Sequence, residues 1–217
     1  MKQSPSKILK SDFRNWDRIG NASVSEIFLK GKEPSGDLTL VLEIVLDPNE
    51  TFTFPGRNNE TLLILPLFGT LVLEDESIVA GENVVYKTCK RKDTTLQNTS
   101  DEEKLDFLLF CFEEENTEDS FFKNSVSFDN RNCLSEINPH LKSKNFIGLY
   151  NGREEECYTL QNSENAVFGM VVNGAFEFQN RLLENRDAIL LWGIEALEFE
   201  ALGEDALVLF LETSICS

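Results

Sequence analysis

The sequence of 217 residues predicts an all-β protein, and three observations support this fold class. Hydrophobic residues recur with a period of two along most of the chain, which is typical of strands. Short apolar runs are separated by Gly, Asn and Asp turns, as in β-sandwiches and β-barrels. The sequence has no long amphipathic helix. The best short candidate runs from Ser135 to Lys142, and Pro139 inside it disfavours a helix.

Strands are predicted in chain order from apolar alternation and from the turns beside it. Residues 38–46 place Leu or Ile at every second position, and two apolar runs within residues 63–73 flank a turn at Gly69. Asn173-Gly174 lies between two apolar pairs, which predicts a tight hairpin. Residues 206–211 form a continuous apolar run, which predicts one more buried strand.

The chain contains an internal repeat with an offset of 105 residues. In both copies a strand, a tight Gly turn, a second strand, an acidic turn and a third strand follow one another. The residues related by this offset include Gly69 and Gly174, Glu82 and Asp187, and Val84 and Ile189. The repeat predicts two similar β-units joined by a less regular stretch.

The repeat also predicts where the two domains divide. Residues 1–125 are expected to form an N-terminal barrel together with an N-terminal arm. Residues 126–217 are expected to form a connecting segment, with a short helix or two, and a C-terminal barrel.

The residues that carry the repeat resemble a known family. Residues 63–70, followed by Val79-Ala80-Gly81-Glu82, resemble the N-terminal cupin of pirin-like proteins, and residues 167–212 resemble the C-terminal cupin of the same bicupin family. The resemblance implies two tandem jelly-roll (cupin) β-barrels. For metal-bearing members it also implies an iron site and quercetinase-like dioxygenase activity in the N-terminal barrel.

The resemblance places the family's metal ligands on Pro55, Arg57, Asp93 and Thr95, and none of them is a histidine. Non-haem iron needs imidazoles with a carboxylate, and an arginine cation opposes a divalent metal. A slip in register makes Glu60 a candidate but supplies no histidine. We therefore expect no metal and no cofactor, and treat the four positions as a candidate ligand pocket.

Two roles remain open for the charged pair in this pocket. Arg57 and Asp93 could form an ion pair that braces the pocket in place of the metal, with Thr95 adding a hydrogen bond. Alternatively, both side chains point into solvent on the barrel rim.

In the second barrel the same four positions fall on Leu160, Asn162, Glu198 and Glu200. The two glutamates alternate with apolar residues, so they should leave one face of a strand together. Such a pair could bind Ca²⁺ or Mg²⁺, but alternation of this kind is typical of a half-solvated strand, and we favour a surface role.

Charge and composition exclude several classes of function. The net charge of −18 disfavours nucleic acid and anionic membranes as partners. The single histidine, His140, leaves no Ser-His-Asp triad with a spare histidine and no multi-histidine metal site. No apolar stretch is long enough to span a membrane and no signal peptide is visible.

The five cysteines also indicate a compartment. Cys89, Cys111, Cys133, Cys157 and Cys216 are an odd number and include no CxxC pair, so we expect free thiols in the cytoplasm.

The expected function is that of a metal-free, non-catalytic module that binds a small ligand or a protein partner, as a monomer. The alternative is a cupin enzyme. It would be either a quercetinase-type dioxygenase with an atypical site or a metal-independent isomerase or lyase that uses Arg57 and Asp93.

Overall fold

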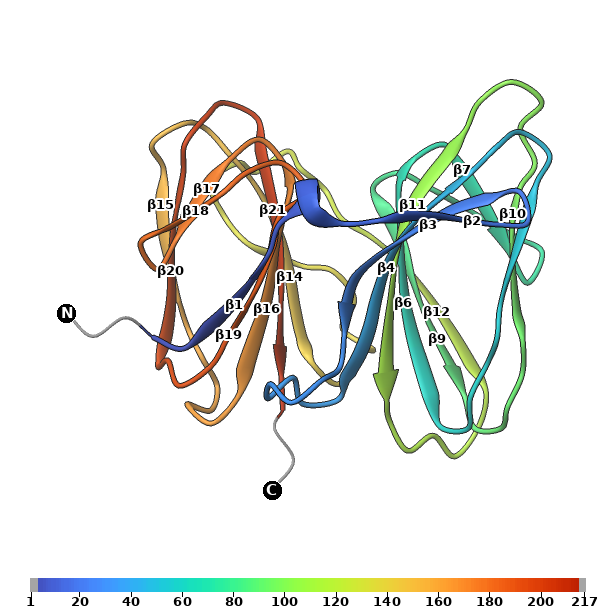
Figure 1. Ribbon diagram of the computed structural model, residues 1–217, viewed down its shortest axis with the longest axis horizontal. Helices are drawn as coiled ribbons and strands as arrows, with labels where there is room; N and C mark the ends of the chain where they lie inside the picture. The colour runs from blue at the N-terminus through green and yellow to red at the C-terminus, as the bar shows by residue number, and fades with distance from the viewer. Residues whose placement is uncertain (1–3, 215–217) are drawn as a thin grey trace. The chain divides into compact units, whose positions relative to one another are not determined.

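The structure, a computed structural model, describes residues 4–214 and is almost entirely β (Figure 1). It divides into two compact units. The N-terminal unit contains residues 14–29 and 38–126, and the C-terminal unit contains residues 4–13, 30–37 and 127–214. Each unit consists of a long sheet and a short sheet, as expected for a jelly-roll barrel.

In the N-terminal unit the long sheet has the strand order β12-β9-β6-β11-β4-β3-β2 and the short sheet has the order β5-β10-β7-β8. The strands are β2 (Trp16–Ile19), β3 (Ala22–Leu29), β4 (Leu38–Leu46), β5 (Thr51–Phe54), β6 (Glu60–Phe68), β7 (Thr70–Leu73), β8 (Glu76–Val79), β9 (Glu82–Thr88), β10 (Thr94–Asn98), β11 (Leu105–Glu113) and β12 (Ser120–Ser125).

In the C-terminal unit the two sheets have the orders β1-β19-β16-β21-β14-β13 and β15-β20-β17-β18. The strands are β1 (Ser6–Leu9), β13 (Ser135–Glu136), β14 (Lys144–Tyr150), β15 (Glu155–Thr159), β16 (Ala166–Asn173), β17 (Phe176–Phe178), β18 (Arg181–Leu183), β19 (Ala188–Leu191), β20 (Ala196–Ala201) and β21 (Ala206–Thr213). The short 3-10 helix η1 (Ser11–Phe13) follows β1.

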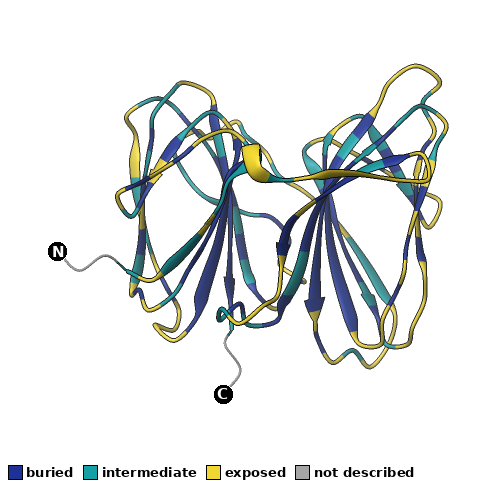
Figure 2. Cartoon of the chain, in the orientation of Figure 1, coloured by how far each residue is buried: buried dark blue, intermediate teal, exposed yellow. Residues whose placement is uncertain are grey.

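Each unit encloses its own apolar core. In the N-terminal unit, alternate residues of β6 and β11, such as Leu62, Ile64 and Phe107, pack inward. In the C-terminal unit the core is rich in aromatic rings, among them Phe176 and Phe210. Figure 2 shows the buried residues concentrated along the central strands of both long sheets.

The repeat predicted from the sequence is present in the backbone. Gly69 and Gly174 both adopt a left-handed conformation, with φ of 83° and 81°. The Glu82 carboxylate accepts the N–H of Val79 at 3.0 Å, and the Asp187 carboxylate accepts the N–H of Glu184 at 2.9 Å. The same acidic cap therefore closes the same turn in both units.

The Asn173-Gly174 turn is not the tight hairpin that the sequence predicted. β16 pairs with β19 and β21, whereas β17 pairs with β18 and β20. The turn carries the chain from one sheet of the barrel to the other. A local turn signal gives the sharp change of direction but does not determine which strands pair.

The helix predicted between Ser135 and Lys142 does not form, and residues 126–214 contain no helix elsewhere. Residues 135–136 form strand β13, and the chain then turns. The Asn138 side chain accepts the N–H of His140 at 3.1 Å, and its backbone N–H donates to the Asn145 side chain at 2.7 Å. These local bonds compete with a helix, and Pro139 cannot donate to one.

The N-terminal arm also differs from the prediction, because it belongs to the C-terminal unit. β1 pairs antiparallel with β19, with Ile8 opposite Ile189. The division of the remaining chain after residue 126 lies next to the predicted boundary at 125. None of the helices in residues 4–214 is long and apolar enough to cross a membrane.

Candidate functional site

The four positions predicted for the pocket of the N-terminal barrel lie at the ends of β5 and β10, which pair with Thr94 opposite Phe54. Pro55, Arg57, Asp93 and Thr95 are all exposed. The neighbouring positions face inward instead: Phe52, Phe54, Thr94 and Leu96 are buried. A shift of one residue reverses the face of a strand, so counting from the nearest turns placed the candidates on the outer face.

Of the two roles left open for Arg57 and Asp93, the ion pair does not form, and both residues are exposed. The Asp93 carboxylate accepts the backbone N–H of Gly56 at 3.1 Å instead. A Cβ on Gly56 would lie 1.8 Å from the carbonyl oxygen of Lys92, so only glycine allows the two chain segments this close approach. Asp93 therefore fixes the loop after β5 and does not pair with Arg57.

Arg57 instead lines a small pocket of about 130 Å³ at the start of β6 and the end of β11. The residues around it are Thr39, Arg57, Asn58, Asn59, Glu60, Phe112 and Glu113. Glu60 is 4% exposed, and its carboxylate accepts the N–H of Arg57 at 3.2 Å. Pro55, Asp93 and Thr95 are not among the lining residues.

Burial controls the ionisation of the groups beside this pocket. It raises the pKa of the Glu60 carboxyl, although the N–H and the charge of Arg57 oppose the rise. It also raises the pKa of the Cys111 thiol well above its ordinary value, and the nearby Glu60 adds to this effect. Cys111 is thus held as a neutral thiol in the core.

The residues at this end of the barrel do not fit the iron site that the resemblance implied. The inward side chains of β5 and β10 are two phenylalanines, a leucine and a threonine, which offer no imidazole. Nowhere in residues 4–214 do three His, Cys, Asp or Glu side chains gather in a way that could hold a metal ion. We therefore derive no step through a metal.

The C-terminal unit presents a different surface. Leu160 is buried and Asn162 is exposed, so they do not form a site together. Glu198 and Glu200 leave one face of β20, as the alternation predicted. The residues that alternate with them, Leu197 and Phe199, are buried on the other face.

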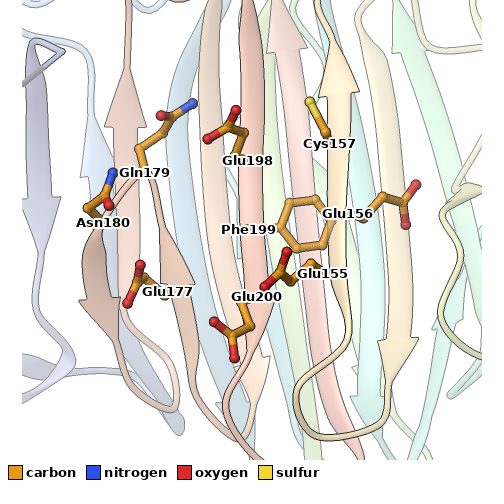
Figure 3. Close-up of a pocket in the computed structure, with 9 residues that line it drawn as sticks. All are labelled: Glu155, Glu156, Cys157, Glu177, Gln179, Asn180, Glu198, Phe199 and Glu200. Atoms are coloured by element: carbon orange, nitrogen blue, oxygen red, sulfur yellow. The ribbon is translucent and has the colours of Figure 1, made fainter. Parts of the chain in front are cut away.

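This outer face of β15, β20 and β17 forms an open groove of about 490 Å³. It is lined by Glu155, Glu156, Cys157, Glu177, Gln179, Asn180, Glu198, Phe199 and Glu200 (Figure 3). The strand register places Glu155 and Glu177 on either side of Glu200. Like charges directly opposite one another destabilise a sheet, and Arg153 offsets part of this repulsion through a 3.2 Å contact with Glu200. The groove repels anions and attracts cations.

Two pairs of polar side chains on the inner side of the C-terminal barrel were not predicted from the sequence. The Tyr150 hydroxyl donates to Glu156, and the Tyr158 hydroxyl donates to Glu212 at 2.6 Å. The signal was present in the sequence: Glu212 follows Val208 and Phe210 at a spacing of two, which is the period of the buried face. Glu60 precedes Leu62 and Ile64 in the same way.

The comparison with sequence families gives a match over about a third of the chain. Residues 143–213 match the family described as the quercetinase C-terminal cupin domain. No curated protein sequence matches the chain.

Solved structures match the whole chain. The structure of YhhW from Escherichia coli is similar with a TM-score of 0.83 and 17% identity, and covers 98% of this chain and 99% of its own. Bacterial pirin YhhW in complex with nickel(II), also from Escherichia coli, has a TM-score of 0.84, 17% identity and coverage of 98% and 100%. Quercetin 2,3-dioxygenase from Acinetobacter baumannii has a TM-score of 0.74, 11% identity and coverage of 98% and 79%.

At these identities the structural likeness establishes the fold. It covers both units, and the sequence match falls in the C-terminal unit, where the resemblance had placed the second cupin. The chain therefore has the two-barrel cupin fold of these structures, and its residues 143–213 resemble the quercetinase C-terminal cupin domain.

Proposed function

We propose that the protein is a non-catalytic binding module that uses the pirin-like bicupin fold without a resident metal. The observation that carries this proposal is the identity of the inward side chains on β5 and β10. Phe52, Phe54 and Leu96 fill the end of the barrel with apolar atoms, and their exposed fractions are 6%, 5% and 0%. Iron or nickel would need imidazole and carboxylate ligands in their place.

The small pocket at Glu60 supports a binding role for the N-terminal unit. It brings a buried carboxyl and an exposed guanidinium together in about 130 Å³. A few polar groups that converge on a pocket are typical of ligand sites. The free thiols of the chain further favour a reducing compartment such as the cytoplasm.

The enzyme alternative has less support. A metal-independent isomerase or lyase that uses Arg57 and Asp93 requires both groups to face one substrate. Asp93 does not line the pocket, and its carboxylate is bonded to the backbone of Gly56.

Metal analysis tests the proposal directly. Protein purified without a histidine tag should contain far less than one iron, nickel or manganese ion per chain by inductively coupled plasma mass spectrometry. Incubation with each metal followed by dialysis should leave this content low. The melting temperature should also stay unchanged, because a ligand stabilises a protein only when it binds the native state.

A parallel assay should detect no oxygen consumption with quercetin. Near-stoichiometric metal, or quercetin turnover that depends on the protein, would overturn the proposal and restore the dioxygenase alternative.

A further inference from the structure

The pocket at Glu60 has an unusual distribution of charge. Its buried end is formed by Glu60 at the start of β6, and its outer end by Arg57 in the loop before that strand. Glu113, which lies opposite Glu60 in the β6–β11 pairing, lines it as well. Phe112 also lines it, but the Phe112 ring is 1% exposed and leaves the sheet on the face opposite to Glu60.

The buried carboxylate lacks hydrogen-bond donors. A carboxylate can accept about four hydrogen bonds. Within the described residues, Glu60 accepts one, from the backbone N–H of Arg57 to Oε2 at 3.2 Å. An ionised carboxylate that is 4% exposed with a single donor is poorly compensated. A ligand that brings a cation or several N–H groups would supply the missing donors.

At the outer end, the group without an ion-pair partner is the cation of Arg57. The Arg57 side chain is exposed, and the ion pairs formed among residues 4–214 do not include it. Its guanidinium carries N–H donors in a planar fork that matches a carboxylate. The side-chain oxygen of Asn58, also at the rim, accepts the N–H of Arg91 at 2.8 Å. The pocket therefore holds a carboxylate at Glu60 and a guanidinium at Arg57 that are in no ion pair among the described residues, although the charge of Arg57 acts on Glu60.

We propose that this pocket binds a small zwitterion, such as an α- or β-amino acid, with its ammonium on Glu60 and its carboxylate on Arg57. The volume of about 130 Å³ equals that of roughly four water molecules in the liquid, at ~30 Å³ each, which suits a ligand of a few heavy atoms. Glu113, which lies opposite Glu60 in the strand pairing, adds a second carboxylate for the ammonium.

The inference rests on the proposed binding function and names the ligand class for one site. It is tested on the full chain, labelled with ¹⁵N, by titration with glycine, β-alanine and γ-aminobutyrate, which differ in the separation of their charges. Acetate and methylamine serve as probes that carry only one of the two charges. The readout is the shift of the backbone amide signals of residues 57–61.

At least one zwitterion should shift these signals to saturation, and acetate and methylamine should bind at least about tenfold more weakly, a difference of ~1.4 kcal/mol. Glu60→Gln keeps the shape of the side chain and removes its charge, and should weaken zwitterion binding at least about tenfold. Arg57→Gln, at an exposed position where folding is not at risk, should do the same. Glu102→Gln, an exposed acid of the same unit that does not line the pocket, should bind like the unmodified chain.

The inference is overturned if none of the three zwitterions shifts these signals at about 50 mM, a concentration that would reveal even millimolar binding. It is also overturned if acetate binds as well as the zwitterions, or if both variants bind as the unmodified chain does. The metal analysis is independent of these results. If the protein is free of metal and does not bind zwitterions, only the proposed ligand class is refuted. If the protein contains a resident metal, the proposed function is refuted.

Discussion

Glu212 shows how a single buried carboxylate can organise a loop. It is 2% exposed and lies on the inner face of β21. Its oxygens accept the Tyr158 hydroxyl at 2.6 Å, the backbone N–H groups of Gln161 and Asn162 at 2.9 and 3.3 Å, and the Asn165 side-chain amide at 2.6 Å. These donors compensate the burial of the charge and hold the segment between β15 and β16 in place.

Replacement of Glu212 by Gln should therefore be costly although the shape of the side chain is retained, because an NH₂ group would face some of these donors. We expect the free energy of unfolding to fall by about 2–4 kcal/mol, from several weakened hydrogen bonds of ~1–3 kcal/mol each. Urea denaturation with an unchanged m-value would measure this loss.

The matched controls lie in the same unit. Tyr158→Phe removes one of the donors and should cost about 1 kcal/mol. Glu198→Gln, on the exposed face of β20, should change stability by less than about 0.5 kcal/mol. A Glu212→Gln protein as stable as the Glu198→Gln protein would contradict the expected role.

At the scale of elements, an acidic turn attaches the N-terminal strand to its barrel. The Asp187 carboxylate accepts the Lys10 ammonium at 2.7 Å and the Ser11 N–H at 2.8 Å, in addition to the Glu184 N–H. Burial alone would raise the pKa of Asp187, but these hydrogen bonds outweigh it and hold the pKa below its ordinary value. The turn before β19 thus fixes the residues that follow β1.

This shift predicts an acid-sensitive contribution to stability. The folded pKa of Asp187 lies below the unfolded value of about 3.9, so its contribution is present above that value and is lost as the pH falls through the folded pKa. Asp187→Asn should lower the free energy of unfolding by about 1–3 kcal/mol at pH 7. The difference from the unmodified chain should shrink below about pH 4.

Urea denaturation at several pH values between 7 and 3 would measure this difference. Glu195→Gln, at an exposed position of the same unit, is the control and should leave the acid dependence unchanged. A difference between Asp187→Asn and the unmodified chain that stays constant down to pH 3 would show that the carboxylate does not contribute in this way.

The elements also show how much the sequence could predict. β4 follows from apolar alternation and β21 from a continuous apolar run, and both are buried along most of their length. The Gly69 turn and the acidic caps follow from local chemistry. The pairing of β16 and β17 could not be predicted, since a turn signal acts over four residues and the choice of sheet depends on the whole barrel.

The candidate site was predicted only in part, for a related reason. Irregular segments at residues 55–59 and 89–93 interrupt the strands between the nearest turns and these positions, so counting residues did not fix which face each side chain would take. Glu60 was the better candidate, because it has the same spacing of two as Leu62 and Ile64 and starts a regular strand.

At the scale of the whole molecule, the chain passes repeatedly between its two units. Residues 4–13 and 30–37 belong to the C-terminal unit although residues 14–29 lie in the N-terminal one. Lys7 pairs with Glu33 at 3.1 Å, and the Ser143 hydroxyl donates to the Asp37 carboxylate at 3.0 Å. The C-terminal unit is therefore assembled from three separate stretches of sequence.

A fragment of residues 126–217, cut at the boundary that the repeat suggests, should consequently fold poorly by itself. It lacks β1, so the edge of β19 is left unpaired, and exposed edges favour aggregation. We expect non-cooperative thermal unfolding by circular dichroism and oligomers in size-exclusion chromatography. Addition of a peptide of residues 4–13 should restore part of the cooperativity. A monomeric fragment that melts cooperatively at the temperature of the full chain would contradict this expectation.

The pairing of β1 with β19 has a consequence for synthesis on the ribosome. Ile8 is opposite Ile189, and at about 5–20 residues per second its partner is made roughly 10–40 s later. In the N-terminal unit, β12 pairs with β9 and follows it closely in the chain, so that barrel can close soon after its residues emerge. The nascent C-terminal barrel instead depends on β1, which is synthesised early and stays unpaired until β19 has been made. This unpaired segment is where a chaperone would act.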